Sequence, residues 1–327
     1  VLKELVEELF SEGLIKVLYV TETFAVGINM PAKTVCFESL RKYDGYNFRT
    51  LNTKEYFQIA GRAGRRGIDE VGYVIVLINR QGFNYKEIKR VTTEDVEPII
   101  SQFKLSINTI LNLVDQHTEE EIEHILRMSF YSYQQYGQNY YKIQTKVLLS
   151  RYYSILRKLN KLDYIKSNHL TNKGHFSARI FADEITMGEI FATDFAKELD
   201  EYQILLVLAA LVYEYKDGSN PDRDNHKEQL RNLFRMIHDN DYLKKERKLV
   251  ANLHKISWLI NPLYEGESFF DILKNTDLLE GDIIRIYAQI IDRIGQILKS
   301  NVDYYLRAIL ENCQSLIKTT LEGFYLV

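Results

Sequence analysis

Three short apolar runs rich in β-branched residues lie within the first 80 positions and constrain the fold most. They are IKVLYV at 15–20, TVCFES at 34–39 and GYVIVLI at 72–78. A run that is apolar at nearly every position is typical of a strand buried in a parallel sheet, because both of its faces are covered. A helix is predicted between the second and third runs, in NTKEYFQIAGRAG at 52–64. This region therefore predicts part of an α/β domain.

Helical periodicity dominates the rest of the chain. Residues 1–12 carry apolar side chains at helical spacing, and Asn52 or Thr53 is the expected N-cap of the helix at 52–64. Further helices are predicted in three segments: 95–130, 145–162 and almost throughout after 184.

The segment DYIKSNHLTNKGHFSARIF, at 163–181, alternates polar and apolar residues around an expected turn at Asn172–Gly174. Helices followed by such a hairpin indicate a winged helix. The predicted fold class is thus α/β followed by all-α. Its expected domains are a partial parallel-sheet domain at 1–92, a winged-helix domain at 93–182 and a helical bundle at 183–327.

Charge and composition narrow the function classes. The net charge is −3; residues 1–90 carry 14 Lys and Arg against 11 Asp and Glu, and the remainder carries 28 against 34. A broadly basic face for nucleic acid is therefore not predicted, and any such contact needs a locally lined channel. No apolar run reaches membrane-spanning length, so a membrane is not an expected partner.

Cysteine and histidine usage predicts neither disulfides nor a metal site. Cys36 and Cys313 lie far apart, and we expect both to be reduced core residues of a cytoplasmic protein. The seven histidines show no pair with metal-ligand spacing. The chain begins with VLKELVEELF and without an initiator Met, so we expect it to be a fragment.

The segment QIAGRAGRRG at 58–67 is the strongest sign of chemistry. It places three arginines within five positions, and arginines are costly to bury unless they meet anions. Glycine lets the backbone approach a ligand closely, and the guanidinium matches phosphate oxygens. The alternative is a basic helix end that forms surface ion pairs, and this segment alone does not decide between the two.

The segment TETFAVGINMPA at 21–32 favours the phosphate interpretation. It follows the first predicted strand directly, and α/β proteins place ligand contacts at the carboxyl ends of their strands. An ordinary turn there would not need two threonines, a glycine and an asparagine together.

These two segments resemble motifs V and VI of superfamily-two helicases, and more narrowly the DExH-box RNA helicases of the superkiller and exosome-cofactor type. PAKTVCFESLRKYDG at 31–45 is similar to the stretch between those motifs. Other stretches resemble that group's winged helix, at 101–114, 123–134, 169–180 and 183–191, and its helical DSHCT domain, at 268–292. The resemblance covers nearly the whole chain and implies that residues 1–92 belong to a second RecA-like domain.

The resemblance implies roles for individual residues of the first domain. Arg62 and Arg65 would be catalytic arginine fingers that reach the ATP phosphates. The other implied contacts are to nucleotide, by Gln58, Gly27 and Asn29, and to the nucleic-acid backbone, by Thr21 and Thr23.

A long helix from Glu280 carries a polar stripe whose ordinary interpretation is a solvated face. The stripe consists of Arg285, Gln289, Asp292 and Gln296. The resemblance implies that this helix is a ratchet helix on which Arg285 contacts bases, together with Glu214 from a neighbouring helix. An arginine there suits a sequence-tolerant grip on a single strand.

The tyrosine-rich stretch YSYQQYGQNYY at 131–141 favours a surface connection, with base stacking as the alternative. It stands where eukaryotic members of the group insert a long arch, which is expected to be absent here.

No GxxxxGK[ST] phosphate loop and no DExH sequence is present. ATP and Mg²⁺ are thus the expected cofactors of a full-length enzyme, none bound by these residues alone, and this chain alone is expected to be inactive as an ATPase. The expected partners are single-stranded RNA, the first RecA-like domain of the same polypeptide and an RNA-degradation complex. The expected location is cytoplasmic, with the nucleus left open.

The predicted function is part of a 3′-to-5′ RNA helicase, an ATP-hydrolysing enzyme that unwinds or remodels RNA for processing or degradation. Two alternatives remain open. One is a DNA helicase of the same superfamily, because no residue recognisably reads a 2′-hydroxyl. The other is a non-catalytic binding scaffold derived from a helicase, against which the intact arginines argue.

Overall fold

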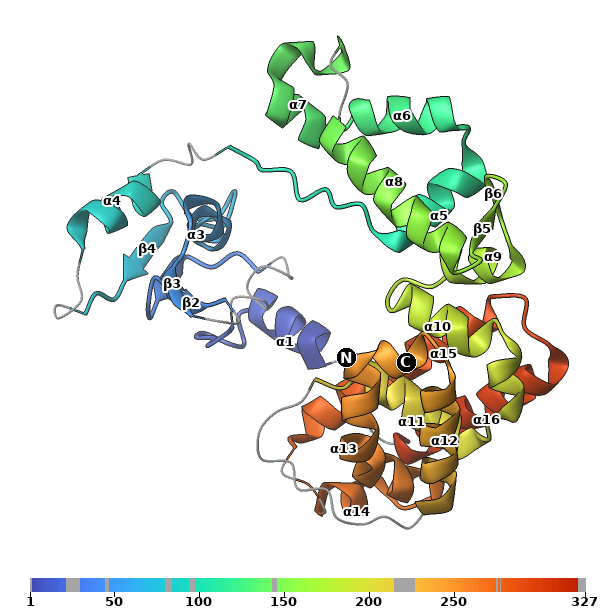
Figure 1. Cartoon of the computed structure of the whole chain (residues 1–327). Helices are drawn as coiled ribbons and strands as arrows, with labels where there is room; N and C mark the ends of the chain where they lie inside the picture. Colours follow the sequence, from blue (N-terminus) through green and yellow to red (C-terminus); the bar gives the residue numbers. More distant parts are fainter. Residues whose placement is uncertain are drawn as a thin grey trace. The chain divides into compact units, whose positions relative to one another are not determined.

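The computed structural model describes residues 2–21, 30–44, 47–79, 84–93, 98–142, 146–214, 227–274, 276 and 278–322. The chain divides into two compact units, Val1–Ile100 and Ser101–Val327 (Figure 1). Most of the described residues are helical. The described elements of the first unit are α1 (Leu2–Ser11), β1 (Thr34–Phe37), β2 (Arg41–Tyr43), β3 (Phe48–Thr50), α3 (Thr53–Ala60), β4 (Tyr73–Val76) and α4 (Tyr85–Thr93).

The first unit contains the small parallel sheet that the sequence predicts. β1 and β4 pair in parallel, with Cys36 opposite Ile75, and β2 and β3 form an antiparallel hairpin that was not predicted. Asn52, one of the two expected caps, begins α3 through a capping box with Glu55. The buried core of this unit consists of Phe37, Leu40, Leu51, Tyr56, Ala60 and Val91.

Two expectations for this unit are wrong. Residues 15–20 form no strand, and their apolar side chains reach solvent: Val17 is 69% and Tyr19 94% exposed. The run pairs with no strand in the described part of the chain, so its apolar composition does not lead to burial. Cys36 is likewise exposed rather than in the core, because it lies on a face of β1 that its neighbours leave open.

The second unit begins with a cluster of short helices and a two-stranded hairpin. Its core is formed by residues such as Ile110, Leu126, Leu159 and Tyr164, all completely buried. The elements are α5 (Ile107–Gln116), α6 (Glu119–Arg127), α7 (Phe130–Tyr136), the 3₁₀ helix η2 (Gly137–Lys142), α8 (Lys146–Lys161), β5 (Ile165–Lys166), β6 (His169–Leu170) and α9 (Asn172–Ala178).

The hairpin turn is not where the sequence indicated. Residues 172–174 begin helix α9, and the chain reverses at Ser167 and Asn168, whose φ angles of 52° and 60° suit a primed two-residue turn. Residues 172–174 are helical because the Thr171 hydroxyl accepts the backbone N–H of Gly174 at 3.1 Å and so caps α9. Similarly, the helix expected from residue 95 begins only at Ile107, after a non-helical segment at 98–106.

The rest of the second unit is a helical bundle around α11. Nearly every side chain of α11 is buried, and it packs against α13, α15 and α16 (Figure 1). Cys313 of α16 lies in this core as expected, and burial raises the pKa of its thiol to about 12. The elements are α10 (Glu184–Phe191), η3 (Asp194–Glu198), α11 (Glu201–Val212), α12 (Lys227–Asp239), η4 (Leu243–Lys245), α13 (Arg247–Tyr264), α14 (Phe269–Lys274), α15 (Glu280–Leu298) and α16 (Tyr304–Thr320).

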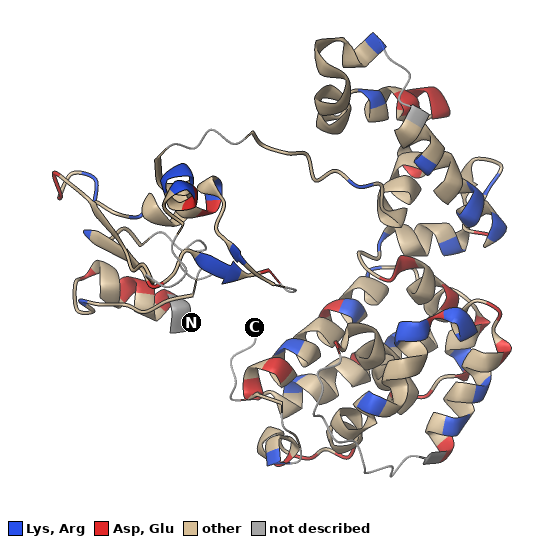
Figure 2. Ribbon diagram, turned by 60° about the vertical axis from the view of Figure 1, so that its left-hand side comes forward, with Lys and Arg blue, Asp and Glu red and all other residues tan. Residues whose placement is uncertain are grey.

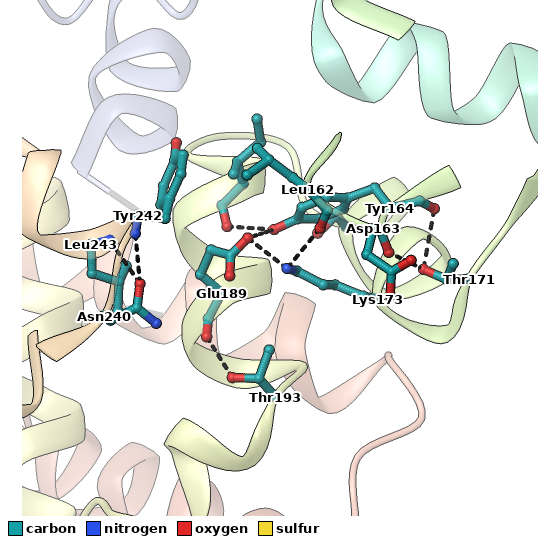
Figure 3. Close-up of polar contacts among 12 residues, drawn as sticks. Leu162, Asp163, Tyr164, Thr171, Lys173, Glu189, Thr193, Asn240, Tyr242 and Leu243 are labelled. Carbon is teal, nitrogen blue, oxygen red and sulfur yellow. Dashed lines mark hydrogen bonds and ion pairs between the residues drawn. The ribbon is translucent and has the colours of Figure 1, made fainter. Parts of the chain in front are cut away.

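A buried polar cluster joins the hairpin region to the bundle (Figure 3). Lys173 lies 2.6 Å from the carboxylate of Glu189 and donates to the carbonyl of Leu162 at 3.0 Å. The hydroxyl of Tyr164 donates to the same carboxylate and to the carbonyl of Ile185. Burial, with the nearby Glu189 charge, raises the pKa of Tyr164 well above its ordinary value, so this hydroxyl is a permanent donor.

No described helix is long and apolar enough to cross a membrane. Within the described ranges, no three His, Cys, Asp or Glu side chains gather to hold a metal ion.

Gly174 is expected to be intolerant of a side chain although its φ is ordinary. A Cβ atom there would lie 2.1 Å from the carbonyl oxygen of Tyr164. Gly174→Ala should therefore lower the free energy of unfolding by about 1–3 kcal/mol, because the backbone must move apart. Thermal unfolding followed by circular dichroism measures this.

Gly295→Ala is the matched control, since Gly295 lies in α15 with open space around its Cβ position. That change should stabilise the helix slightly. If the two variants unfolded at the same temperature, close packing at Gly174 would be disproved.

Candidate functional site

The arginine-rich segment follows α3 as a loop built on glycine. Gly61 caps the helix by donating its N–H to the carbonyls of Phe57 and Ile59. Gly64 and Gly67 adopt φ angles of +88° and +79°, which residues with side chains rarely adopt. The glycines in this segment are thus explained by the backbone path, independently of any ligand.

The loop is held against the chain that leads into β1. The N–H of Ala32 donates to the carbonyl of Arg62 at 2.9 Å, and the N–H of Gly64 donates to the carbonyl of Ala32 at 2.7 Å. A Cβ atom on Gly72 would lie 2.5 Å from Ala63, so the segment before β4 closes over the loop. Backbone hydrogen bonds therefore join the segments 21–32 and 58–67. They fix the backbone positions from which the arginine side chains extend.

Arg65 is held by Asp69, one helical turn further along the chain. Its Nε and Nη2 donate to the two carboxylate oxygens at 2.8 and 2.9 Å, and its backbone N–H donates to the same carboxylate at 3.0 Å. The guanidinium lowers the pKa of Asp69 to about 2, and the carboxylate raises the pKa of Arg65. This side-on contact leaves Nη1 without an acceptor in the described part of the chain.

The predicted site residues of the first unit are only partly brought together. Thr21 and Arg62 line one depression of about 410 Å³, which also exposes Cys36. Gln58 is exposed on α3, and neither it nor Arg65 lines this depression. The predicted contacts Thr23, Gly27 and Asn29 lie outside the described residues.

The two predicted base contacts of the helical bundle meet at a second, small pocket of about 30 Å³. Glu214 follows the end of α11, where the amide of Asn252 donates to the carbonyls of Ala210 and Tyr213 and so fixes the chain's exit. Arg285 lies in the first turns of α15, with its Nη2 3.4 Å from Asp282. Both candidate side chains are exposed.

The polar stripe of α15 divides into two parts. Gln289 and Arg285 line the pocket, whereas Gln296 donates to Asp292 at 2.7 Å and accepts the backbone N–H of Phe181 at 3.0 Å. Arg293 binds Asp183 and the carbonyl of Ala182. The later half of α15 therefore attaches the bundle to the α9–α10 connection, and its earlier half carries the residues that line the pocket.

Sequence reasoning missed two acidic residues of these sites. Asp69 and Asp282 each bind a predicted functional arginine, Arg65 and Arg285 respectively. Their signal was an acid four residues after, or three residues before, an arginine, a spacing that brings side chains together on a helix or turn.

Comparison with known proteins shows which family part of this chain matches. Residues 167–320 match the DSHCT (NUC185) domain family. The match includes the end of the hairpin, Lys173 and Glu189 of the polar cluster and both sides of the Glu214–Arg285 pocket. The resemblance to a family with a helical DSHCT domain is therefore confirmed for this part of the chain.

The similar curated proteins are RNA helicases and a superkiller protein. Exosome RNA helicase MTR4 of Mus musculus is 49% identical over 138 residues, 42% of this chain and 13% of that protein. DExH-box ATP-dependent RNA helicase DExH10 of Arabidopsis thaliana is 47% identical over 135 residues, 41% of this chain and 14% of that protein. Superkiller complex protein 2 of Homo sapiens is 48% identical over 130 residues, which are 40% of this chain and 10% of that protein.

The matched segment thus spans about a tenth to a seventh of each relative. Together with the domain match, these similarities confirm the resemblance to DExH-box RNA helicases of the superkiller and exosome type.

The Arg65–Asp69 pair predicts an acid-shifted titration. Asp69 should titrate near a pH of about 2 rather than at 3.8, because the guanidinium stabilises its charged form. The folded pKa is depressed, so the stability that the pair contributes is present above the unfolded pKa and is lost as the pH falls towards about 2. Carboxyl carbon shifts in an NMR titration measure this.

Arg65→Gln should move the Asp69 midpoint back towards its ordinary value. Glu55 is an internal control: its pKa is lowered to about 2 chiefly by Arg49, against the effect of burial and with help from Lys42. It should be unaffected by the change. An unchanged Asp69 midpoint in Arg65→Gln would disprove the pairing.

Proposed function

We propose that this chain is part of an ATP-dependent RNA helicase that moves 3′ to 5′ and unwinds or remodels RNA for processing or degradation. The observation that carries the proposal is the meeting of Glu214 and Arg285 at one pocket of a DSHCT domain. A carboxylate and a guanidinium side by side can hydrogen-bond base edges, and an exposed arginine can stack on a base.

The proposed domains are a RecA-like part at 1–92, a winged helix at 93–182 and a DSHCT bundle at 183–327. Three separate hydrophobic clusters support this division, since each proposed domain contains most of one of them. The parallel pairing of β1 and β4 supports the RecA-like assignment. The β5–β6 hairpin, which precedes α9, supports the winged-helix assignment.

The proposed role of Arg62 and Arg65 is to stabilise negative charge on the ATP phosphates. The glycine-based loop supports this role because its backbone is fixed by hydrogen bonds before any nucleotide binds. Gln58, Gly27 and Asn29 are proposed as further nucleotide contacts, and Thr21 and Thr23 as contacts to the nucleic-acid backbone. Mg²⁺ and the remaining ATP contacts would come from a first RecA-like domain, so we propose that these 327 residues alone do not hydrolyse ATP.

The proposed partners are single-stranded RNA and an RNA-degradation complex, in the cytoplasm. RNA is preferred to DNA because two of the similar proteins are named as RNA helicases. The complex is proposed because two are named for the exosome and the superkiller complex.

The arginine role is tested in the polypeptide that contains both helicase domains. Arg62→Ala and Arg65→Ala should each lower the kcat of RNA-stimulated ATP hydrolysis by about 1,000-fold, because each removes charge stabilisation from the transition state. Steady-state phosphate release measures kcat.

Arg66→Ala is the matched control: Arg66 is the exposed third arginine of the loop, and its replacement should leave kcat unchanged. An undiminished kcat in Arg65→Ala would remove the finger assignment.

The base-contact role is tested by binding. Arg285→Ala and Glu214→Ala should each raise the Kd for single-stranded RNA by about tenfold, the effect of losing one good base contact. Fluorescence anisotropy with a labelled oligouridylate measures Kd. Arg235→Ala, an exposed arginine on α12, controls for the loss of one positive charge. If Arg235→Ala raised the Kd as much as Arg285→Ala, the weaker binding would be due to the loss of net charge and not to a lost base contact.

A further inference from the structure

Four aromatic rings form a continuous series on α7 and η2. Phe130 and Tyr133 stack with centroids 6.1 Å apart and planes 16° from parallel. Tyr133 meets Tyr140 edge-on at 5.5 Å, and Tyr140 meets Tyr141 edge-on at 5.8 Å. We call these four residues the aromatic series. The ammonium of Lys142 lies 5.4 Å from the centre of the Tyr141 ring.

The series is exposed although its rings touch one another. Phe130, Tyr133 and Tyr141 are 48%, 44% and 46% exposed. Ser129 caps α7, and Gly137, with a φ of +66°, turns the chain so that η2 packs back on α7. The fold thus holds the rings in place while leaving their surface to solvent, and such an arrangement needs a reason beyond core packing.

The segment around the series is basic within an otherwise acidic region. Residues 124–162 contain seven Lys and Arg and no Asp or Glu, whereas the chain as a whole carries −3. Four of the cations, Arg151, Arg157, Lys158 and Lys161, occupy exposed positions of α8 at helical spacing. Figure 2 shows Lys and Arg recurring along α8.

We propose that the aromatic series is a second contact site for single-stranded nucleic acid, in addition to the Glu214–Arg285 pocket. Exposed rings offer faces on which bases stack without regard to sequence, and the ammonium of Lys142, beside the Tyr141 ring, attracts the phosphates. Exposed amide side chains between the rings, at 135, 138 and 139, can hydrogen-bond base edges.

The chemistry favours nucleic acid over a protein partner. Aromatic side chains are common at protein interfaces too, but lysine is depleted there, and here the ammonium of Lys142 lies beside the Tyr141 ring. This surface combines rings with amides and one cation, Lys142, and the residues from 129 to 142 include no aliphatic side chain. The series lies at the end of α8 away from α10 (Figure 1), so it extends the nucleic-acid surface beyond α15.

The test compares two double variants of the 327-residue chain. Tyr133→Ala with Tyr141→Ala should raise the Kd for a labelled oligouridylate of about 12 nucleotides by about tenfold or more, because two stacking faces are lost. Tyr133→Phe with Tyr141→Phe keeps both rings and should bind like the unchanged chain. Circular dichroism checks that both variants fold.

Crosslinking identifies the site directly. An oligonucleotide with 4-thiouridine should crosslink to peptides from 129–142 in the unchanged chain and in Arg285→Ala, but not in the double alanine variant. Unchanged affinity in the double alanine variant, or crosslinks confined to α15, would overturn the proposal while leaving the function proposed for Arg285 intact. Loss of self-association in the alanine variant, with RNA binding unchanged, would assign the rings to a protein contact instead and overturn it too.

The converse result is distinguishable. If Arg285→Ala bound normally and the double alanine variant did not, the aromatic series would stand and the proposed role of Arg285 would fall. If the unchanged chain bound no single-stranded RNA at low salt, the proposed contact site at the aromatic series would be disproved.

Discussion

The ion pair between Lys173 and Glu189 is the interaction on which the arrangement of the second unit depends. Glu189 is 8% exposed, and a carboxylate in such surroundings is costly unless a cation and donors meet it. Lys173 from α9 and the Tyr164 hydroxyl both do so. The pair therefore joins α9 to α10, and Arg293 extends the connection to α15 by binding Asp183. These polar contacts add to the core packing of α15, in which Tyr287, two residues from Arg285, is buried and donates its hydroxyl to the carbonyl of Leu259 at 3.1 Å.

Two of the candidate functional arginines, Arg65 and Arg285, are each accompanied by an acid that was not among the predicted site residues. Asp69 binds Arg65 side-on at 2.8 and 2.9 Å, and Asp282 lies 3.4 Å from Arg285. A carboxylate in this place restricts the guanidinium to few rotamers, which reduces the entropy lost when an anion or a base binds. The carboxylate also offsets part of the positive charge of the guanidinium. The placement of the arginine side chain therefore contributes more to ligand binding at these sites than their net charge does.

The sequence predicted local structure well where one physical cause acted alone. TVCF and YVIV became paired parallel strands, and Asn52 became the cap of α3. It failed where two causes competed. Asn172–Gly174 has the composition of a turn, but Thr171 caps a helix there, and the glycine is needed for close packing against Tyr164. The pairing of Glu214 with Arg285 followed from family resemblance, since no spacing in the sequence indicates that α11 and α15 are neighbours.

Net charge was a poor guide to nucleic-acid contact for a physical reason. Phosphates respond to the potential within about 10 Å at moderate salt, and acids elsewhere on a chain of this size are screened from them. Residues 124–162 contain no acid, although Glu119 and Glu123 of α6 accept the Tyr153 hydroxyl of α8 at 2.7 and 3.2 Å. A chain with a charge of −3 can therefore present a surface that a single strand meets as basic and aromatic. The relevant quantity is the local arrangement of rings and cations, which only the fold reveals.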